Sequence, residues 1–70
     1  MHREFRDTVE SLTLDSDPPG VTFTGRRGFY GITTAPGEVL DTLRDSLMTG
    51  QRVRVTCDAA SLLIVDAIAD

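Results

Sequence analysis

The chain has 70 residues, with eleven acidic side chains against seven basic ones that are all arginine, and a formal net charge of −4. This length supports one domain, expected over residues 1–70, and buries only about 60% of the surface that the unfolded chain exposes, so self-association or a protein partner is physically reasonable. The acidic, lysine-free composition disfavours strong nonspecific attraction to phosphate backbones, which leaves only a local arginine cluster to provide it.

The N-terminal stretch MHREFRDTVE is charged throughout and lacks the apolar segment of a signal peptide, so no leader is expected. Residues 8–14 are expected to form the first strand, because apolar and hydroxyl side chains alternate in its second half. A helix over residues 3–12 is the alternative, since Phe5, Val9 and Leu12 follow a helical spacing. Residues 1–6 are expected to be frayed or to form a short helical lead-in.

The stretch DSDPPG, residues 15–20, is expected to be a loop, because two prolines and a glycine continue neither a helix nor a strand. Its two aspartates suggest a cation site at first sight. A calcium loop needs a longer series of ligands and a closing glutamate, and neither follows. An Asx turn before the prolines is the better interpretation, and no metal is expected.

Residues 21–24 (VTFT) and 29–34 (FYGITT) predict a hairpin, with GRRG as its turn and Arg26 and Arg27 at the tip. In that register Phe23 faces Tyr30. The predicted core face consists of Val21, Phe23, Tyr30 and Ile32. Phe29 falls on the solvent side beside the two arginines, where neighbouring small residues leave it open.

The clearest element is a helix over residues 36–50, PGEVLDTLRDSLMTG. Pro36 suits the first turn, and Gly50 is placed to end the helix in the left-handed conformation. Asp41 and Arg44 can pair on the wet side. The helix is expected to bury one apolar stripe of Val39, Leu40, Leu43, Leu47 and Met48.

Residues 51–57 (QRVRVTC) alternate strictly, which predicts a strand with Arg52 and Arg54 pointing outward. Its inward face consists of Val53, Val55 and Cys57. Cys57 is the only cysteine, so no intramolecular disulfide forms, and a buried structural thiol is expected.

Residues 62–69 (LLIVDAIA) predict a last strand that is apolar on both faces, and its run LLIV is far too short to span a bilayer. Leu63, Val65 and Ala67 share one face, opposite Leu62, Ile64, Asp66 and Ile68. Asp66 is expected to pair with Arg52 or Arg54 on the adjacent strand, because an unpaired buried carboxylate is costly.

The resulting order, β-β-β-α-β-β, resembles the OB-fold superfamily, above all over the stretch VLDTLRDSLMTGQRVRVTC. The resemblance implies a mainly β domain with one helix, built as a small five-stranded barrel. An SH3-like barrel or an open α+β sheet accepts the same pattern.

OB-folds bind oligonucleotides on the face of strands 2 and 3, where aromatic side chains stack on bases. The resemblance therefore implies weak binding of single-stranded DNA or RNA, with a site made of Arg26, Arg27 and Phe29 and extended by Arg52 and Arg54. Two acidic loops, residues 15–20 and the loop that begins at Asp58, oppose it because they repel phosphates. The alternative is a protein-interaction or homo-oligomeric module that uses the helix and the last-strand face of Leu63, Val65 and Ala67.

No pair of catalytic groups is identifiable in the sequence. A cysteine nucleophile needs a base, and His2, the only histidine, stands at the terminus. One histidine and one cysteine cannot build a zinc site. The sequence therefore predicts a cytoplasmic, non-enzymatic binding module without a metal or cofactor and without a membrane segment.

Overall fold

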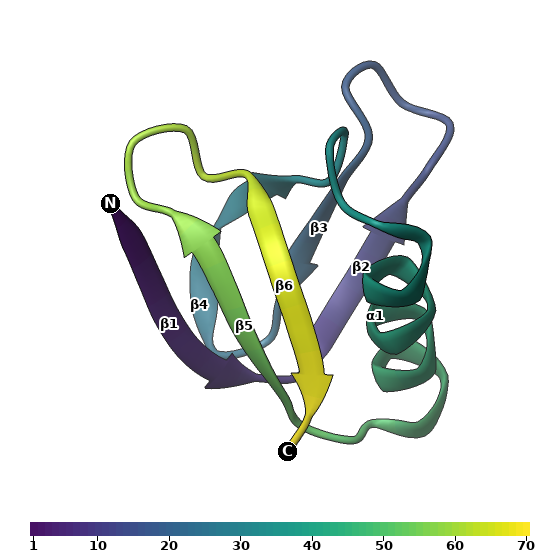
Figure 1. Ribbon diagram of the computed structural model, residues 1–70. Coiled ribbons are helices and arrows are strands. Elements are labelled where there is room, and N and C mark those ends of the chain that lie inside the picture. Colours follow the sequence, from purple (N-terminus) through teal and green to yellow (C-terminus); the bar gives the residue numbers. More distant parts are fainter.

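The computed structural model describes all residues, 1–70, as a mainly β fold with one helix. The elements are β1 (His2–Asp7), β2 (Val9–Thr13), β3 (Gly20–Phe23), β4 (Arg26–Gly31), α1 (Gly37–Thr49), β5 (Val53–Asp58) and β6 (Ile64–Ala69). Two three-stranded antiparallel sheets, β1-β5-β6 and β2-β3-β4, face each other (Figure 1). The mainly β class with one helix is confirmed, but the closed five-stranded barrel is wrong, because six strands form two sheets.

The N-terminal segment is a strand interrupted at Thr8. Its first half, β1, pairs with β5, and its second half, β2, pairs with β3. Phe5 lies opposite Val55 and is buried, so cross-strand packing outweighs the helical spacing of residues 3–12. The helical alternative and the frayed or helical lead-in at residues 1–6 are therefore wrong.

The two sheets are joined by a β-bridge at only one point, so they do not close into a barrel. Gly31 and Leu63 form an isolated parallel bridge, and Gly31 donates its N–H to the carbonyl of Leu62 at 2.9 Å. A tight turn precedes this point, because the N–H of Leu62 bonds back to the carbonyl of Asp58 at 2.8 Å. β6 begins only after it, at Ile64, so the two strands meet at their ends and do not run side by side.

The helix confirms its predicted limits to within a residue. It follows Pro36 and ends at Gly50, which has φ 77° and donates its N–H to the carbonyl of Ser46. It lies alongside β2 and β6 (Figure 1). The buried stripe is narrower than predicted: Val39, Leu43 and Ser46 are buried and Leu40 is partly buried, whereas Leu47 and Met48 are exposed.

The core lies between the sheets and under the helix. Phe5, Phe23 and Tyr30 form an aromatic cluster with ring centroids 5.0 to 5.4 Å apart. The core face predicted for the hairpin is confirmed, since Val21, Phe23, Tyr30 and Ile32 are all buried. The burial of Val53, Val55 and Cys57 is confirmed as well.

The hairpin register differs from the prediction. Thr24 and Gly25 form the turn, so Phe23 lies opposite Arg26 and Val21 opposite Tyr30. Arg26 therefore begins β4 and does not stand at the tip. Between these two pairs β4 contains more residues than β3, so β4 bulges. Gly28 lies in this bulge with φ 120°, a backbone conformation that glycine adopts readily.

The last strand also contains a bulge. Thr56 lies opposite Asp66 and Cys57 opposite Ile64, which leaves Val65 without a partner residue. Strict alternation is lost there, so Ala67 is buried and Ile68 is exposed. Asp66 is exposed and accepts the N–H of Ala67, so its predicted pairing with an arginine is wrong. The fold contains no helix with the length and apolar character to cross a membrane.

Candidate functional site

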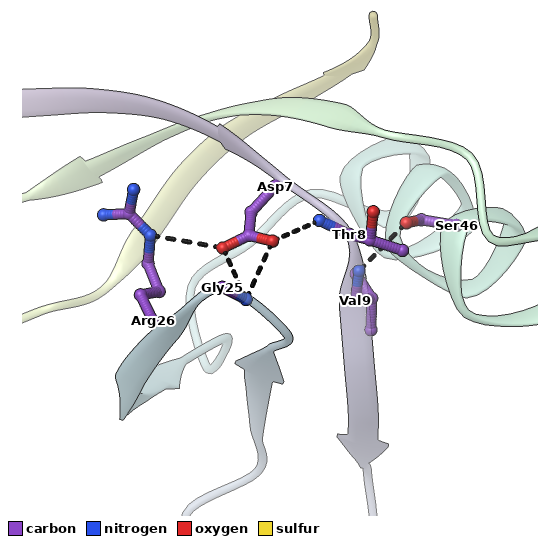
Figure 2. Close-up of polar contacts among 6 residues, drawn as sticks. All are labelled: Asp7, Thr8, Val9, Gly25, Arg26 and Ser46. Carbon is purple, nitrogen blue, oxygen red and sulfur yellow. Dashed lines mark hydrogen bonds and ion pairs between the residues drawn. The ribbon is translucent and has the colours of Figure 1, made fainter.

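A carboxylate holds the bend between the sheets. Asp7 accepts the N–H of Gly25 at 3.0 and 3.1 Å and the N–H of Thr8 at 2.7 Å, and its other contact is Arg26 Nε at 3.5 Å (Figure 2). These contacts fix the turn of the hairpin against the end of β1. They also account for the shifted register, because the carboxylate binds the turn at Gly25 and draws Arg26 toward β1.

Arg26 is consequently part of the packing. Its guanidinium carbon lies 3.8 Å from the ring centroid of Phe5, over an aromatic side chain of the core. Its Nε is buried and faces only the Asp7 carboxylate. The side chain remains partly exposed, but its contacts with Asp7 and Phe5 connect β4 to β1. It is therefore less available to an external ligand.

Ser46 holds the other side of the bend. Its hydroxyl accepts the N–H of Val9 at 3.1 Å (Figure 2). The same hydroxyl donates to the carbonyl of Gln51 at 2.6 Å. One buried side chain of α1 thereby joins the start of β2 to the segment that leads into β5. Asp7 and Ser46 therefore hold the same end of the sheet β2-β3-β4, where β2 begins at Val9 and the hairpin turns at Gly25.

Phe29 lies on the outer face of the sheet β2-β3-β4 and is 46% exposed, in keeping with its predicted solvent side. The far end of its ring covers Gly20 on β3, where a Cβ would overlap the ring. The glycine thus provides the floor on which the aromatic ring lies.

Leu63 occupies the matching position over Gly31. A Cβ at Gly31 would lie 2.6 Å from Cδ2 of Leu63. Because Gly20 and Gly31 are directly opposite each other across β3 and β4, Phe29 and Leu63 lie side by side. We name these two side chains on their two glycines the Phe29–Leu63 surface. No spacing in the sequence indicated it, because it depends on the bridge between Gly31 and Leu63.

The predicted arginines are not brought together. Arg27 is exposed, lies two residues before Phe29 in the sequence, and makes no ion pair. Arg52 is exposed and precedes β5, whereas Arg54 lies on β5 opposite Arg6, in the other sheet. Of the five residues expected to bind nucleic acid, only Arg27 and Phe29 remain available on one part of the surface.

Arg3 is a residue that the sequence analysis missed. It lies on β1 opposite Cys57, two residues before Phe5 and on the same face. It is exposed and makes no ion pair. The alternation of Arg3, Phe5 and Asp7 is the signal that could have revealed it, had residues 1–6 been assigned to a strand.

Two ionisable side chains, Cys57 and Asp58, have pKa values shifted from their ordinary values. Burial raises the pKa of the Cys57 thiol, although the positive charges of Arg3 and Arg26 act in the opposite direction. The thiol is therefore protonated at neutral pH. Hydrogen bonds from the N–H and hydroxyl of Ser61, both 2.8 Å long, lower the pKa of Asp58.

The interface residues predicted on the last strand are separated as well. Leu63 belongs to the Phe29–Leu63 surface, Val65 is exposed at the bulge, and Ala67 is buried and unavailable to a partner. No pocket indents the surface, and no three histidine, cysteine, aspartate or glutamate side chains gather into a group able to hold a metal ion.

No family model, no curated protein and no solved structure matches this chain.

Proposed function

We propose that this protein is a non-enzymatic protein-interaction module that binds its partner through the Phe29–Leu63 surface. The observation that carries the proposal is the pair of apolar side chains held side by side on Gly20 and Gly31, with Phe29 nearly half exposed. An aromatic ring that already lies against the backbone of a glycine loses little conformational entropy when a partner covers it. Exposed aromatic side chains of this kind are frequent binding hot spots.

The distribution of charge favours a protein partner over a nucleic acid. The chain carries a net charge of −4. Arg26 is engaged by Asp7 and Phe5, and Arg54 belongs to the other sheet. Affinity for a phosphate backbone rises with the number of phosphates neutralised, and few free arginines stand near Phe29.

The test is capture of partner proteins from the source organism's lysate by the wild-type protein and by Phe29→Ala. We expect a specific partner that Phe29→Ala loses. Leu14→Ala is the matched control, because Leu14 is 47% exposed in the loop after β2 and belongs to no strand. A partner retained by Phe29→Ala, or lost equally in Leu14→Ala, contradicts the proposal. Sedimentation over a range of concentrations shows whether the partner is a second copy.

Binding of single-stranded DNA or RNA is the second candidate, and one observation favours it. Phe29 and Arg27, two residues apart on β4, are both exposed, and Arg27 makes no ion pair. One stacking aromatic supplies only about 1–3 kcal/mol, so binding would be weak.

Fluorescence anisotropy of labelled oligo(dT) and oligo(rU) at low and physiological salt tests the second candidate. Nucleic-acid binding requires an affinity that falls with salt and disappears in Phe29→Ala and Arg27→Glu. The absence of binding at low salt rules it out and leaves the protein partner.

A further inference from the structure

We propose that β1 is a self-association site, where a second copy of this chain adds its own β1 in antiparallel order. The sheets β1-β5-β6 of the two copies would then join into one continuous sheet across a two-fold axis. The contact does not involve the Phe29–Leu63 surface, so this inference goes beyond the proposed function and does not rest on it.

β1 is an edge strand that no other element covers. It pairs with β5 on one side and with no strand on the other. α1 lies alongside β2 and β6, whereas β1 forms the left margin of the fold in Figure 1. The register of β1 with β5 runs from His2 to Asp7 without a bulge, so the edge is regular over the whole strand. An uncovered, regular edge is a template for a further strand.

One hydrogen bond shows which backbone groups face this free edge. Ala59 donates its N–H to the carbonyl of Met1 at 2.9 Å, which continues the register between β5 and β1. In an antiparallel ladder every second residue bonds to the neighbouring strand, so the odd-numbered residues of β1 bond to β5. The even-numbered residues direct their N–H and C=O groups to the free edge. These residues are His2, Glu4 and Arg6.

The backbone pattern restricts how a second copy of β1 can pair. Hydrogen bonds form only between residues that both face the edge, so even-numbered residues must lie opposite even-numbered ones. The two-fold axis then passes through a residue, and that residue lies opposite its own copy. Phe5 is the only uncharged residue from Arg3 to Asp7. Any other centre within this stretch brings two like charges together, which is unfavourable, so the axis passes through Phe5.

The charges on either side of Phe5 complement those of a second copy. The stretch REFRD, residues 3–7, carries a positive, a negative, no charge, a positive and a negative charge in that order. In reverse order, each positive charge lies opposite a negative one. Glu4 therefore faces Arg6 of the second copy, and Arg3 faces Asp7 of the second copy. Edge charges of one sign repel a further strand, whereas this order of charges favours a second copy of the same strand.

The side chains for these contacts are available. Glu4 and Arg3 are exposed and make no ion pair. The Nε of Arg6 lies 3.2 Å from the carboxylate of Asp70, which leaves the other N–H groups of its guanidinium for a second carboxylate. The side chain of Asp7 is only 11% exposed. We therefore expect the contacts between Glu4 and Arg6 to contribute more than those between Arg3 and Asp7.

Sedimentation velocity at low salt, over a range of protein concentrations, tests the proposal. Two short strands make a small interface, so we expect a dimer with a dissociation constant between about 10 μM and 1 mM. The dimer should weaken as salt is raised, because its charged contacts are exposed. Amide hydrogen exchange of Glu4 and Arg6 should slow as the dimer forms. A protein that remains monomeric at about 1 mM overturns the proposal.

Two charge reversals locate the contact. Glu4→Arg and Arg6→Glu each place like charges opposite each other twice in the dimer, so each should weaken it at least about tenfold. A mixture of the two variants restores opposite charges at both positions and should form a heterodimer with the affinity of the wild-type dimer. This recovery also shows that both variants fold. Single variants that dimerise like wild type, or a mixture that stays monomeric, overturn the proposal.

Glu10→Arg and Arg52→Glu are the matched controls, since both residues are exposed, lie outside β1 and make no ion pair. They change the net charge by the same amounts, and the dissociation constant should stay within about twofold of the wild-type value. An equal loss in the controls would show that net charge alone acts, and the β1 contact would be wrong.

Phe29→Ala separates this inference from the proposed function. The variant should dimerise like wild type, because Phe29 lies on β4 and not on the edge of β1. A dimer that Phe29→Ala abolishes would place the contact on the Phe29–Leu63 surface. That result would overturn the β1 proposal and identify a second copy as the partner in the proposed function.

Discussion

Asp7 is the side chain whose contacts extend furthest, because one carboxylate serves the bend at Thr8, the turn at Gly25 and the guanidinium of Arg26. We expect Asp7→Ala to lower the free energy of unfolding by about 2–3 kcal/mol, since it removes several charge-assisted contacts at once. Urea denaturation measures the change. Glu10→Ala is the control, because Glu10 is exposed, and its effect should stay within about 0.5 kcal/mol. Equal midpoints for both variants would show that the Asp7 contacts contribute nothing.

Asp58 makes stability depend on pH in a defined direction. Its pKa is lowered in the folded state by the Ser61 hydrogen bonds, so its contribution is complete above the ordinary aspartate pKa, about 3.9. The contribution is lost as pH falls through the folded pKa. We expect wild type to exceed Asp58→Asn in Tm at pH 7, and the difference to shrink when both are measured at pH 3. A difference that is constant with pH would contradict this assignment.

At the scale of an element, the end of α1 depends on Gly50. Because Gly50 has φ 77°, Gly50→Ala should cost about 1 kcal/mol, the usual penalty for a side chain in the left-handed region. Gly37→Ala is the control: a Cβ there meets nothing within 4 Å and φ is not positive, so stability should be unchanged or slightly higher. Thermal unfolding compares the two. If Gly50→Ala is as stable as Gly37→Ala, the helix ends for another reason.

Elements governed by local patterns were predictable, and their registers were not. The helix needed only its apolar spacing, Pro36 and Gly50, and β5 needed only the alternation of Val53, Val55 and Cys57. The turn of the hairpin instead depends on Asp7, which is distant in sequence and binds Gly25. The site prediction failed for the same reason, because the position of Arg26 depends on that contact and on Phe5.

At the scale of the whole molecule, the rate at which the Cys57 thiol reacts with a reagent measures how often the whole fold opens. Its side chain is fully buried on the central strand of β1-β5-β6, and burial raises the pKa of its thiol. We expect labelling by a thiol reagent at pH 8 to be slower than in urea by a factor on the order of 10³, which corresponds to a stability of about 4 kcal/mol. Labelling of the native protein at the unfolded rate would show that β1 or β6 opens locally.

The overall arrangement of the strands was the feature most difficult to predict from the sequence. The sequence supports a mainly β fold with one helix, but the number of strands depends on whether residues 2–7 pair with β5. The Phe29–Leu63 surface also requires that residues from β4 and from the segment before β6 meet at Gly31. Both are contacts between distant parts of the chain, which a local pattern does not report.

The division of the N-terminal strand at Thr8 has a consequence for the order of folding. β2 finds β3 across a short loop, so Thr13 meets Gly20 early, together with the β3–β4 hairpin. β1 must wait for β5, since His2 pairs with Asp58 and Asp7 with Val53. Although β1 precedes the other strands along this chain, it would then be among the last of them to find its partner. Mutations that weaken β1–β5 pairing should therefore speed unfolding more than they slow folding.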